Sequence, residues 1–303
     1  MTKQFIFTVV CTLFFSSLLN SQSAIEPTGF DGDHFSLEGA IDLFKNSSSL
    51  EDFEKKLNEE KSNINNLDLN KDGEIDYLRV EDKMDGDVHA IIVQALISES
   101  ENQDIAVIEI EKTGKETAIL QIIGDEEVFG EQKIVEPFEE QVEQSGKGGP
   151  SANYDFRRVV VNVYFWSPIR FIYTPRYRPY VSPYRWRAYP RYWKPWRPQP
   201  FNIYRGYHVR HHRNYHVVRT HRVVRAHRVY TPHRRTSTVV RKRTTVVRTN
   251  KKGNKVVRQK TTTVKSRNGS KVAGKKSNKV VKKKGTKKVA KRKTTKVRKR
   301  RNN

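Results

Sequence analysis

From Glu74 onward the period of the apolar positions switches to two, most cleanly in IAVIEIE at residues 105–111, and four short runs up to residue 123 are expected to be strands. The runs are Ile75–Val80, Val88–Ile97, Ile105–Glu111 and Ala118–Ile123, and the stretches between them are polar or contain glycine. Alternation sends neighbouring side chains to opposite faces of a sheet, and short polar connections are typical of antiparallel neighbours. The pattern therefore predicts an antiparallel β-meander with one buried face.

Upstream of these strands the apolar spacing becomes that of a helix. One helix is expected over residues 37–45. A second is expected to begin after Ser49, an N-cap with Asp52 in the capping-box position, and its buried face would carry Leu50, Phe53 and Leu57. Two helices can cover one face of a small sheet, and about 100 residues suffice for one modest core. The expected fold class is α+β, a small antiparallel meander with two N-terminal helices.

The first 23 residues have the pattern of a secretory signal peptide. Lys3 precedes the apolar run Phe5–Leu19, and small residues precede the expected cleavage point before Ala24. The run has 15 residues, fewer than the roughly 20 that a transmembrane anchor needs. We expect an exported protein of the periplasm, cell surface or extracellular space, with no transmembrane segment in the mature chain. Because Cys11, the single cysteine, lies in this leader, no disulfide or thiolate site is expected.

Charge divides the remaining chain into two opposite parts. All 33 Asp and Glu residues lie within residues 1–155, together with 12 of the 59 Lys and Arg residues, which gives this part a net charge of −21. Residues 156–303 hold the other 47 basic residues and no acid. An asymmetry of this size indicates anionic partners rather than a particular fold.

Composition then predicts four regions after the signal peptide. They are an acidic α+β domain at 24–144, a hinge at 145–157, an extended Pro-, aromatic- and Arg-rich segment at 158–204, and a tail at 205–303. Frequent proline prevents a regular helix or a central strand in the third region. The tail is rich first in His and Arg and then in Lys, Arg, Val and Thr, and so many like charges with few large apolar residues predict disorder.

The stretch DLNKDGEID at residues 68–76 has the spacing of a calcium loop. Oxygen-bearing side chains recur at alternate positions, and Gly73 allows a sharp turn. The expected ligands of calcium are Asp68, Asn70, Asp72, Glu74 and Asp76. The loop resembles the first nine residues of an EF-hand loop, but Arg79 stands where an EF-hand has its bidentate glutamate, so the shorter DxDxDGxxD loops of extracellular β-domains are closer. The alternative is an Asp/Asn/Gly turn that binds no ion.

Nothing in the sequence indicates an enzyme. The chain has no glycine-rich phosphate loop and neither a GxSxG nor an HExxH motif. His34 and His89 are isolated, and His89 lies in an expected strand, where a surface or satisfied core role is favoured over that of a base. We therefore expect no catalytic residues.

Aromatic rings and arginines interleave between residues 164 and 204. Arginine forks pair with phosphate or carboxylate groups, and rings stack on sugars, bases or guanidinium groups. We expect polyanion binding by this run and the histidine–arginine repeat after it, through Arg176, Arg178, Arg185, Trp186, Arg187, Arg191, Trp193, Trp196, Arg197, Arg222, Arg225 and Arg228. The alternatives are an inert spacer and a strip that packs on the domain.

Seven of the nine histidines lie between residues 208 and 233. Clustered imidazoles can bind transition metals, and they gain charge near a pH of about 6.5. Because arginines surround each of them and repel a cation, we expect a gain of positive charge at low pH rather than a specific metal site.

Several motifs together resemble a family of uncharacterised exported proteins of Bacteroidota. They are LDLNKDGEIDYLRVEDKMDGDVHAIIVQALISESENQDIAVIEIEK, the later ILQIIGDEEVFGE and IVEP, and FWSPIRFIYTPRYRPYVSPYRWRAYPRYWKPWRP. The resemblance covers roughly residues 65–200 and rests on motifs alone. It implies export and a shared acidic domain, and it implies no activity or catalytic residue.

These observations predict a non-enzymatic envelope or surface protein whose basic tail binds anionic polymers, namely lipopolysaccharide, acidic glycans or extracellular DNA. Its acidic α+β domain, residues 24–144 and called the head below, would bind calcium. One alternative is a calcium-responsive structural module that self-associates by pairing acidic head with basic tail. Another is a histone-like nucleic-acid binder, which the C-terminal Lys/Val/Thr composition suggests and the signal peptide disfavours.

Overall fold

The structure is a computed structural model. It describes residues 27–145, 153–208, 211 and 214–241, and the backbone of five further strands between residues 245 and 295. The expected signal peptide, residues 1–23, lies outside the described residues, as does the stretch 146–152 of the expected hinge.

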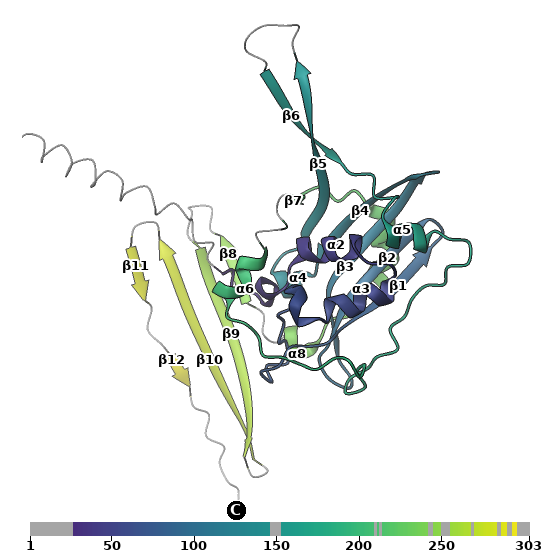
Figure 1. Cartoon of the computed structure of the whole chain (residues 1–303). Coiled ribbons are helices and arrows are strands. Elements are labelled where there is room, and N and C mark those ends of the chain that lie inside the picture. Colours follow the sequence, from purple (N-terminus) through teal and green to yellow (C-terminus); the bar gives the residue numbers. More distant parts are fainter. Residues whose placement is uncertain are drawn as a thin grey trace, which may run out of the picture.

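An antiparallel sheet forms the centre of the molecule (Figure 1). Its strands follow one another in sequence order from β1 to β6, and β7 pairs with β5. They span Leu78–Asp85 (β1), Val88–Leu96 (β2), Asn102–Gly114 (β3), Thr117–Gly124 (β4), Lys133–Ser145 (β5), Asn153–Val160 (β6) and Tyr215–Val218 (β7). The predicted meander is confirmed. Its first strand begins at Leu78 rather than Ile75, because the amide of Ile75 donates instead to the carbonyl of Trp196 at 2.9 Å.

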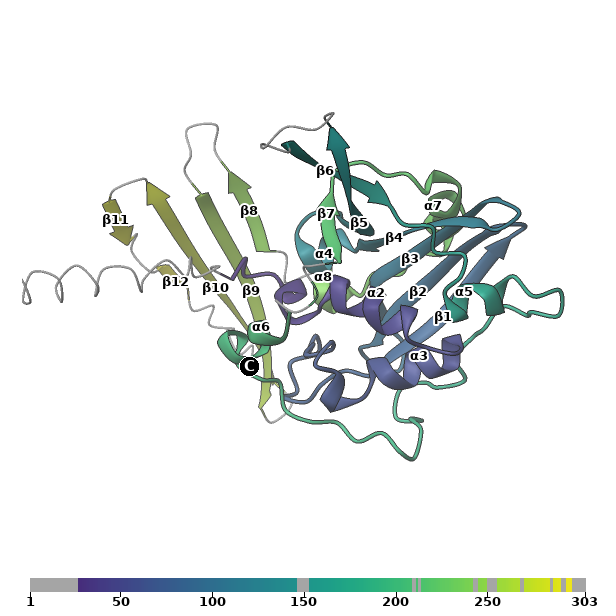
Figure 2. The same cartoon turned by 45° about the horizontal axis from the view of Figure 1, so that its top comes forward.

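Two helices cover one face of this sheet, as the sequence predicts (Figure 2). They are α2 (Leu37–Lys45) and α3 (Leu50–Leu57), flanked by the short helices η1 (Asp31–His34) and η2 (Glu60–Ser62). Ser36 Oγ accepts from the Gly39 amide at 3.0 Å, and Ser49 Oγ accepts from the Asp52 amide at 3.1 Å. These caps satisfy amides that a helix start leaves without a partner, and so they fix where each helix begins.

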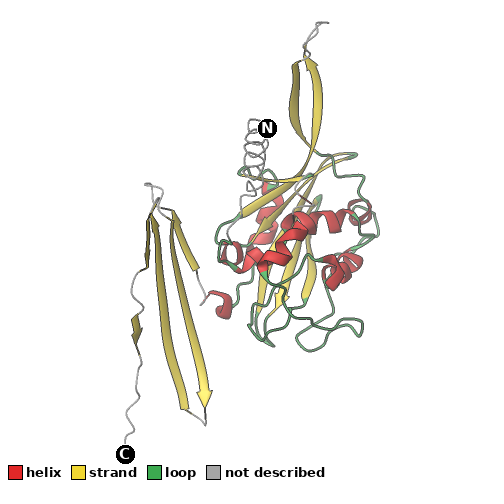
Figure 3. Ribbon diagram, turned by 60° about the vertical axis from the view of Figure 1, so that its left-hand side comes forward, coloured by secondary structure: helices red, strands yellow, loops and turns green. Residues whose placement is uncertain are grey.

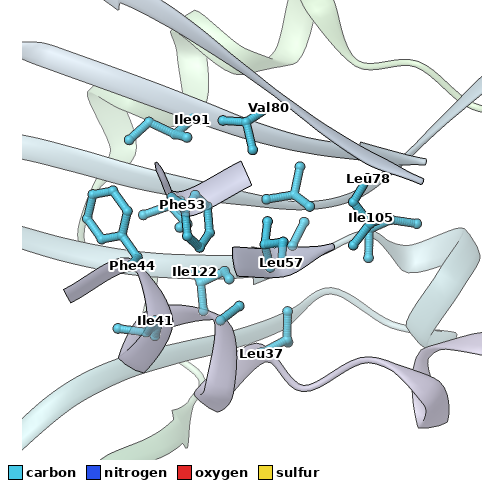
Figure 4. Close-up of a cluster of buried hydrophobic side chains, with 14 of the residues drawn as sticks. Leu37, Ile41, Phe44, Phe53, Leu57, Leu78, Val80, Ile91, Ile105 and Ile122 are labelled. Carbon is cyan, nitrogen blue, oxygen red and sulfur yellow. The ribbon is translucent and has the colours of Figure 1, made fainter. Parts of the chain in front are cut away.

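The core lies between these helices and the sheet (Figure 4). Leucine, isoleucine and phenylalanine side chains from α2 and α3 meet the inward side chains of the strands. The fully buried members include Leu37, Ile41, Phe44, Phe53, Leu57, Leu78, Val80, Ile91, Ile105 and Ile122. One contiguous apolar cluster of this kind is what holds a domain without disulfides together.

The opposite face of the sheet is also covered, so the expectation of a single buried face is wrong. Ala90, Glu109 and Gln121 lie side by side across β2, β3 and β4 on this face, and all three are buried. Figure 2 shows α7 (Val224–Tyr230) on the side of the sheet away from α2 and α3. We call residues 221–237, which contain α7 and η4 (Thr231–His233), the covering segment.

The covering segment corrects the expectation of disorder from residue 205 onward, as far as residue 241. Besides α7, the helices α6 (Phe201–His208) and α8 (Thr238–Arg241) fall at least partly in this range. Elsewhere, α4 spans Glu126–Phe129, and α5 (Ser167–Ile172) corrects the expectation of no regular helix in residues 158–204. Val223, Ala226, Tyr230 and Val240 are buried against the head. These few apolar residues cannot form a core alone, but they complete one when the sheet supplies the other half of the surface. The basic side chains between them find carboxylates on the head, as described below.

Beyond residue 244 the described strands pair only with one another. They are β8 (Thr245–Thr249), β9 (Lys255–Arg267), β10 (Ser270–Lys283), β11 (Thr286–Val289) and β12 (Lys293–Thr295). Their order is β11-β10-β9-β8, and β12 pairs with β10 (Figure 3). That residues 242–303 lack a packed core of their own stays a prediction from composition. None of the described helices combines the length and the apolar run that a membrane span requires.

Candidate functional site

The five expected calcium ligands lie in one loop between η2 and β1. Asp68 accepts from the amides of Asp72 and Gly73 at 3.2 and 3.1 Å, and Asp72 accepts from the amide of Glu74 at 2.9 Å. Asn70 donates to Asp72 at 2.8 Å. These bonds hold a short turn, in which Lys71 and Gly73 have positive φ angles of 63° and 94°. The same bonds also stabilise an ion-free Asx turn, so they do not distinguish a calcium loop from a simple turn.

Asp76 differs from the other four expected ligands because it is buried. Its Oδ2 accepts from the amide of Leu69, while Asp72 and Glu74 are exposed. Burial raises the pKa of Asp76 to about 7, and the charges of Asp68 and Asp72 act in the same direction.

The aromatic–arginine run is folded along β1, the edge strand of the sheet. The amide of Asp82 donates to the carbonyl of Tyr180 at 2.8 Å, and the amide of Ser182 donates to the carbonyl of Val80 at 3.0 Å. These bonds occupy backbone groups that an uncovered edge strand leaves free for pairing with another chain. We call residues 176–197 the arginine strip.

Most rings of the arginine strip pack on the head, whereas Tyr192 is exposed. Trp193 is buried and packs edge-on against the buried Tyr77, with ring centroids 5.1 Å apart. Trp186 and Trp196 are partly buried in the same cluster. Of the alternatives that the sequence left open, the structure therefore supports a strip that packs on the domain for these three tryptophans. Trp193 in particular has little exposed surface on which a polymer could stack.

The arginines of the strip face outward. Arg176, Arg178, Arg185, Arg187, Arg191 and Arg197 are all exposed. Within the part of the chain that the structure describes, none of the six forms an ion pair. The sequence interpretation grouped rings and guanidiniums as one surface, whereas the fold places the six guanidiniums outward and buries Trp193, with Trp186 and Trp196 buried in part. That the arginines bind polymers stays a prediction.

Glu54 anchors the strip to the helices from a buried position on α3. Its carboxylate accepts from Tyr77 Oη at 2.8 Å, from the Val80 amide at 2.7 Å and from Ser182 Oγ at 2.8 Å. Tyr180 lies 3.5 Å from the same group. Burial raises the pKa of Glu54, and these donors act in the opposite direction. The sequence interpretation missed this residue, because its partners are 23 to 128 positions away.

A row of buried carboxylates on the sheet joins it to the covering segment. Glu109 lies 2.6 Å from His221 Nε2 and 2.7 Å from His227 Nδ1. Glu111 accepts from the amides of Arg225 and Ala226 at 2.6 and 3.1 Å. When a buried carboxylate accepts hydrogen bonds from charged groups or amides, these bonds offset the free-energy cost of removing it from water.

The row continues toward the end of the covering segment. Glu136 pairs with the guanidinium of Arg222 at 3.2 Å, and Asp125 pairs with that of Arg234 at 2.7 Å. Asp104 accepts from Tyr230 Oη at 3.1 Å and from the Arg235 amide at 2.8 Å. The apolar residues beside these carboxylates, including Ile92, Val107 and Ile123, pack against Tyr230.

These contacts involve the guanidinium of one of the three arginines expected to bind polymers here. The guanidinium of Arg222 is engaged with Glu136. Arg225 and Arg228 are exposed, and no ion pair of their guanidiniums occurs within the described part of the chain. The sequence did hold a signal for the covering segment, since Val223, Ala226 and Tyr230 recur at helical spacing between basic residues.

The two isolated histidines of the head are structural. His89 is fully buried, and its Nδ1 lies 2.8 Å from Asp82 Oδ2, which also accepts from Tyr177 Oη at 2.8 Å. His34 Nδ1 lies 3.0 Å from Asn66 Nδ2, and burial lowers the pKa of His34. Both side chains tie segments of the fold together.

Comparison of the chain with models of protein families, with curated proteins and with solved structures finds no match. The resemblance to exported Bacteroidota proteins accordingly stays a hypothesis that rests on sequence motifs.

Asp104 gives a prediction about pH. Burial raises the pKa of Asp104 from 3.8 to about 6, helped by the charge of Asp125, while bonds from Gln94, the Arg235 amide and Tyr230 lower it. Between about pH 4 and pH 6 the folded state keeps a proton that the unfolded state has lost, so the free energy of unfolding falls as pH rises. For this group the fall is about 3 kcal/mol.

Asp104→Asn removes this titration. We expect urea unfolding of the variant to lose part of the wild-type decrease in stability between pH 4 and pH 6, and the variant to be more stable at pH 7 by roughly 1–3 kcal/mol. Asp85→Asn, at an exposed turn, is the control. An Asp104→Asn curve parallel to that of the wild type would contradict the effect.

Proposed function

We propose that this is an exported, non-enzymatic protein that binds anionic polymers such as lipopolysaccharide, acidic glycans or extracellular DNA. The observation that carries the proposal is the distribution of charge over the fold. Residues 1–241 contain 32 basic and 33 acidic residues, so the part that includes the folded head is almost neutral. Residues 242–303 contain the remaining 27 basic residues and no acid. The positive charge of residues 242–303 therefore has no carboxylates within the same region to neutralise it.

The six outward arginines supply a second, folded anion-binding surface. Their guanidiniums lie on a strip that backbone bonds and buried rings hold in place, so the backbone loses little freedom when a polymer binds. Arginine also matches carboxylate and phosphate groups in a bidentate way. The export part of the proposal rests on the signal-peptide pattern of residues 1–23.

Titration of the chain with labelled DNA and with an acidic polysaccharide tests the proposal. The log of the association constant should fall linearly with the log of salt concentration, because binding releases counterions. Changing all six strip arginines to glutamine should make this slope shallower, by about 0.9 for each phosphate that the variant no longer neutralises. The matched variant with six lysines keeps the charge and should keep most of the slope.

Two outcomes would count against this function. If neither polymer binds at low salt, the protein is not a polyanion-binding protein. If the glutamine and lysine variants both bind as the wild type does, the strip takes no part and binding belongs to residues 242–303 alone.

We also propose that the loop at residues 68–76 binds calcium. Its support is the spacing of the oxygen-bearing side chains at residues 68, 70, 72, 74 and 76 and the turn that Asp68 and Asp72 stabilise by accepting from backbone amides. Without a bidentate twelfth ligand the affinity should be weak, with a dissociation constant on the order of 10⁻⁴ to 10⁻³ M. Calorimetry should show calcium binding that Asp72→Ala abolishes and Asp85→Ala preserves. Equal heats from both variants, or none from the wild type, would leave the loop as an ion-free turn.

A calcium-responsive module that self-associates is the second candidate. One bond favours a link between the loop and the strip, since the Ile75 amide donates to the carbonyl of Trp196. However, Glu109, Glu111, Asp104 and Glu136 are already bound by the chain's own covering segment. These carboxylates are therefore not available to the tail of another copy, which makes polymer binding the better-supported function.

A further inference from the structure

Glu109 stands between two imidazoles at the centre of the covered face. His221 Nε2 lies 2.6 Å from Oε2 and His227 Nδ1 lies 2.7 Å from Oε1. The two rings are close to each other, with centroids 4.7 Å apart. The three ligand atoms all lie within 4.8 Å of one another, and among the described residues no other group of His, Cys, Asp and Glu side chains meets this condition.

The spacing fits a tetrahedral metal ion with little movement. Zinc binds imidazole nitrogen at 2.0–2.1 Å and carboxylate oxygen at about 2.0–2.2 Å, so neighbouring ligand atoms lie about 3.3 Å apart. Each histidine would have to move away from Glu109 by less than about 1 Å. Two imidazoles and one carboxylate form a set that suits zinc, copper or nickel rather than calcium, which prefers oxygen.

The surroundings allow an ion to enter and a fourth ligand to bind. The Glu109 side chain is fully buried, whereas those of His221 and His227 are 21% and 30% exposed. A cleft of about 240 Å³, lined by His227, Tyr230 and Arg234 among others, opens beside the site. Water can reach the cluster from this side and complete the coordination.

Two of the arginines near the histidines have carboxylate partners, which reduces the repulsion of a cation that the sequence suggested. Arg222 is neutralised by Glu136 and Arg234 by Asp125. Glu111, on the same face as Glu109, accepts from the backbone amides of Arg225 and Ala226. The guanidiniums that face the sheet therefore have their own carboxylates, and Glu109 is left to the two histidines.

We propose that Glu109, His221 and His227 bind one divalent transition-metal ion, of which zinc is the best fit. The ion would join β3 to the covering segment across 112 to 118 positions of sequence. It would attach the covering segment to the sheet face opposite α2 and α3, which that segment buries. This site is separate from the calcium loop and from the arginine strip, and it does not depend on polymer binding.

Zinc titration of the purified, metal-free chain by calorimetry tests the proposal, at a mildly alkaline pH at which imidazoles are neutral. We expect one ion per chain in a distinct tight site, and zinc should raise the midpoint of thermal unfolding. His227→Gln and Glu109→Gln should each lose the tight site and the thermal shift. His233→Ala removes an exposed histidine of the same repeat, outside the cluster, and should keep both.

Cobalt substitution provides a second readout that needs no variant. In the cobalt-loaded wild type, the paramagnetically shifted imidazole resonances should belong to His221 and His227, and β3 resonances near Glu109 should shift with them. The proposal is overturned if no saturable site appears with the wild type. It is equally overturned if His227→Gln and Glu109→Gln both bind zinc as His233→Ala does, or if the shifted histidines are others of the nine.

Discussion

We expect a chain that ends at Arg241 to bind DNA and acidic polysaccharides ~100-fold or more weakly at low salt than the full chain. The deletion removes 27 basic residues and no acidic ones. What remains contains 32 basic and 33 acidic residues, and much of its positive charge is paired within the fold, as between Arg234 and Asp125. The six outward arginines are expected to support only weak binding on their own.

Salt separates the two contributions in this experiment. Because the full chain neutralises more phosphates, its affinity should fall more steeply with salt, and the two curves should approach each other at high salt. The control is the thermal unfolding of the shortened chain. It should match that of the full chain, because the described packing against the head ends at α8. Equal affinity of the two chains at low salt would place polymer binding on the folded head instead.

Replacing Glu54 with alanine lowers the free energy of unfolding by about 4 kcal/mol. The change removes the acceptor of the Tyr77 hydroxyl, the Val80 amide and the Ser182 hydroxyl. A buried donor without a partner costs about 1–3 kcal/mol, and relief from burying the carboxylate offsets part of the total. Denaturant unfolding measures the difference.

Glu51→Ala, on the exposed side of the same helix, is the matched control and should change stability by less than about 0.5 kcal/mol. All four tryptophans lie between residues 166 and 196, so their fluorescence reports on the arginine strip and on the ten residues before it. In the Glu54→Ala variant the tryptophan fluorescence should change at a lower denaturant concentration than the far-ultraviolet circular dichroism does. A decrease in stability below about 1 kcal/mol would show that Glu54 does not anchor the strip.

The parts of the fold that depend on local pattern could be predicted from the sequence. Ser36 and Ser49 cap their helices through amides three residues away, and the hairpins join strands that are neighbours in sequence. Such contacts leave a signature within a few residues of the chain.

The covering segment could not be predicted in the same way, because its partners are distant. His221 and Glu109 are 112 positions apart, and Ser237 and Gln103 are 134 apart. High charge indicated disorder, yet each guanidinium or imidazole of the segment that faces the sheet meets a carboxylate there. Strand β2 did contain a clue, since its sequence VHAIIVQAL is apolar on both faces, as strands buried on both sides are.

The candidate site was predicted only in part for a related reason. Composition showed that rings and arginines interleave, but not that Trp193 faces the head while Arg191 faces solvent. Spacing identified the loop at residues 68–76, whereas Glu54 and Glu109 looked like ordinary acidic residues of a helix and a strand. Their roles arise from the segments that the fold brings to them.

Hydrogen exchange of backbone amides tests the central claim most directly, namely that the chain's own basic segment is bound to the carboxylates of its head. The amides of Arg225, Ala226, Arg235 and Ser237 donate to Glu111, Asp104 and Gln103. At moderate salt they should be protected to a degree approaching that of the strands, because they open only when the covering segment detaches. Exchange of these four amides at the rate of an unfolded chain, while β2 and β3 stay protected, would contradict the account.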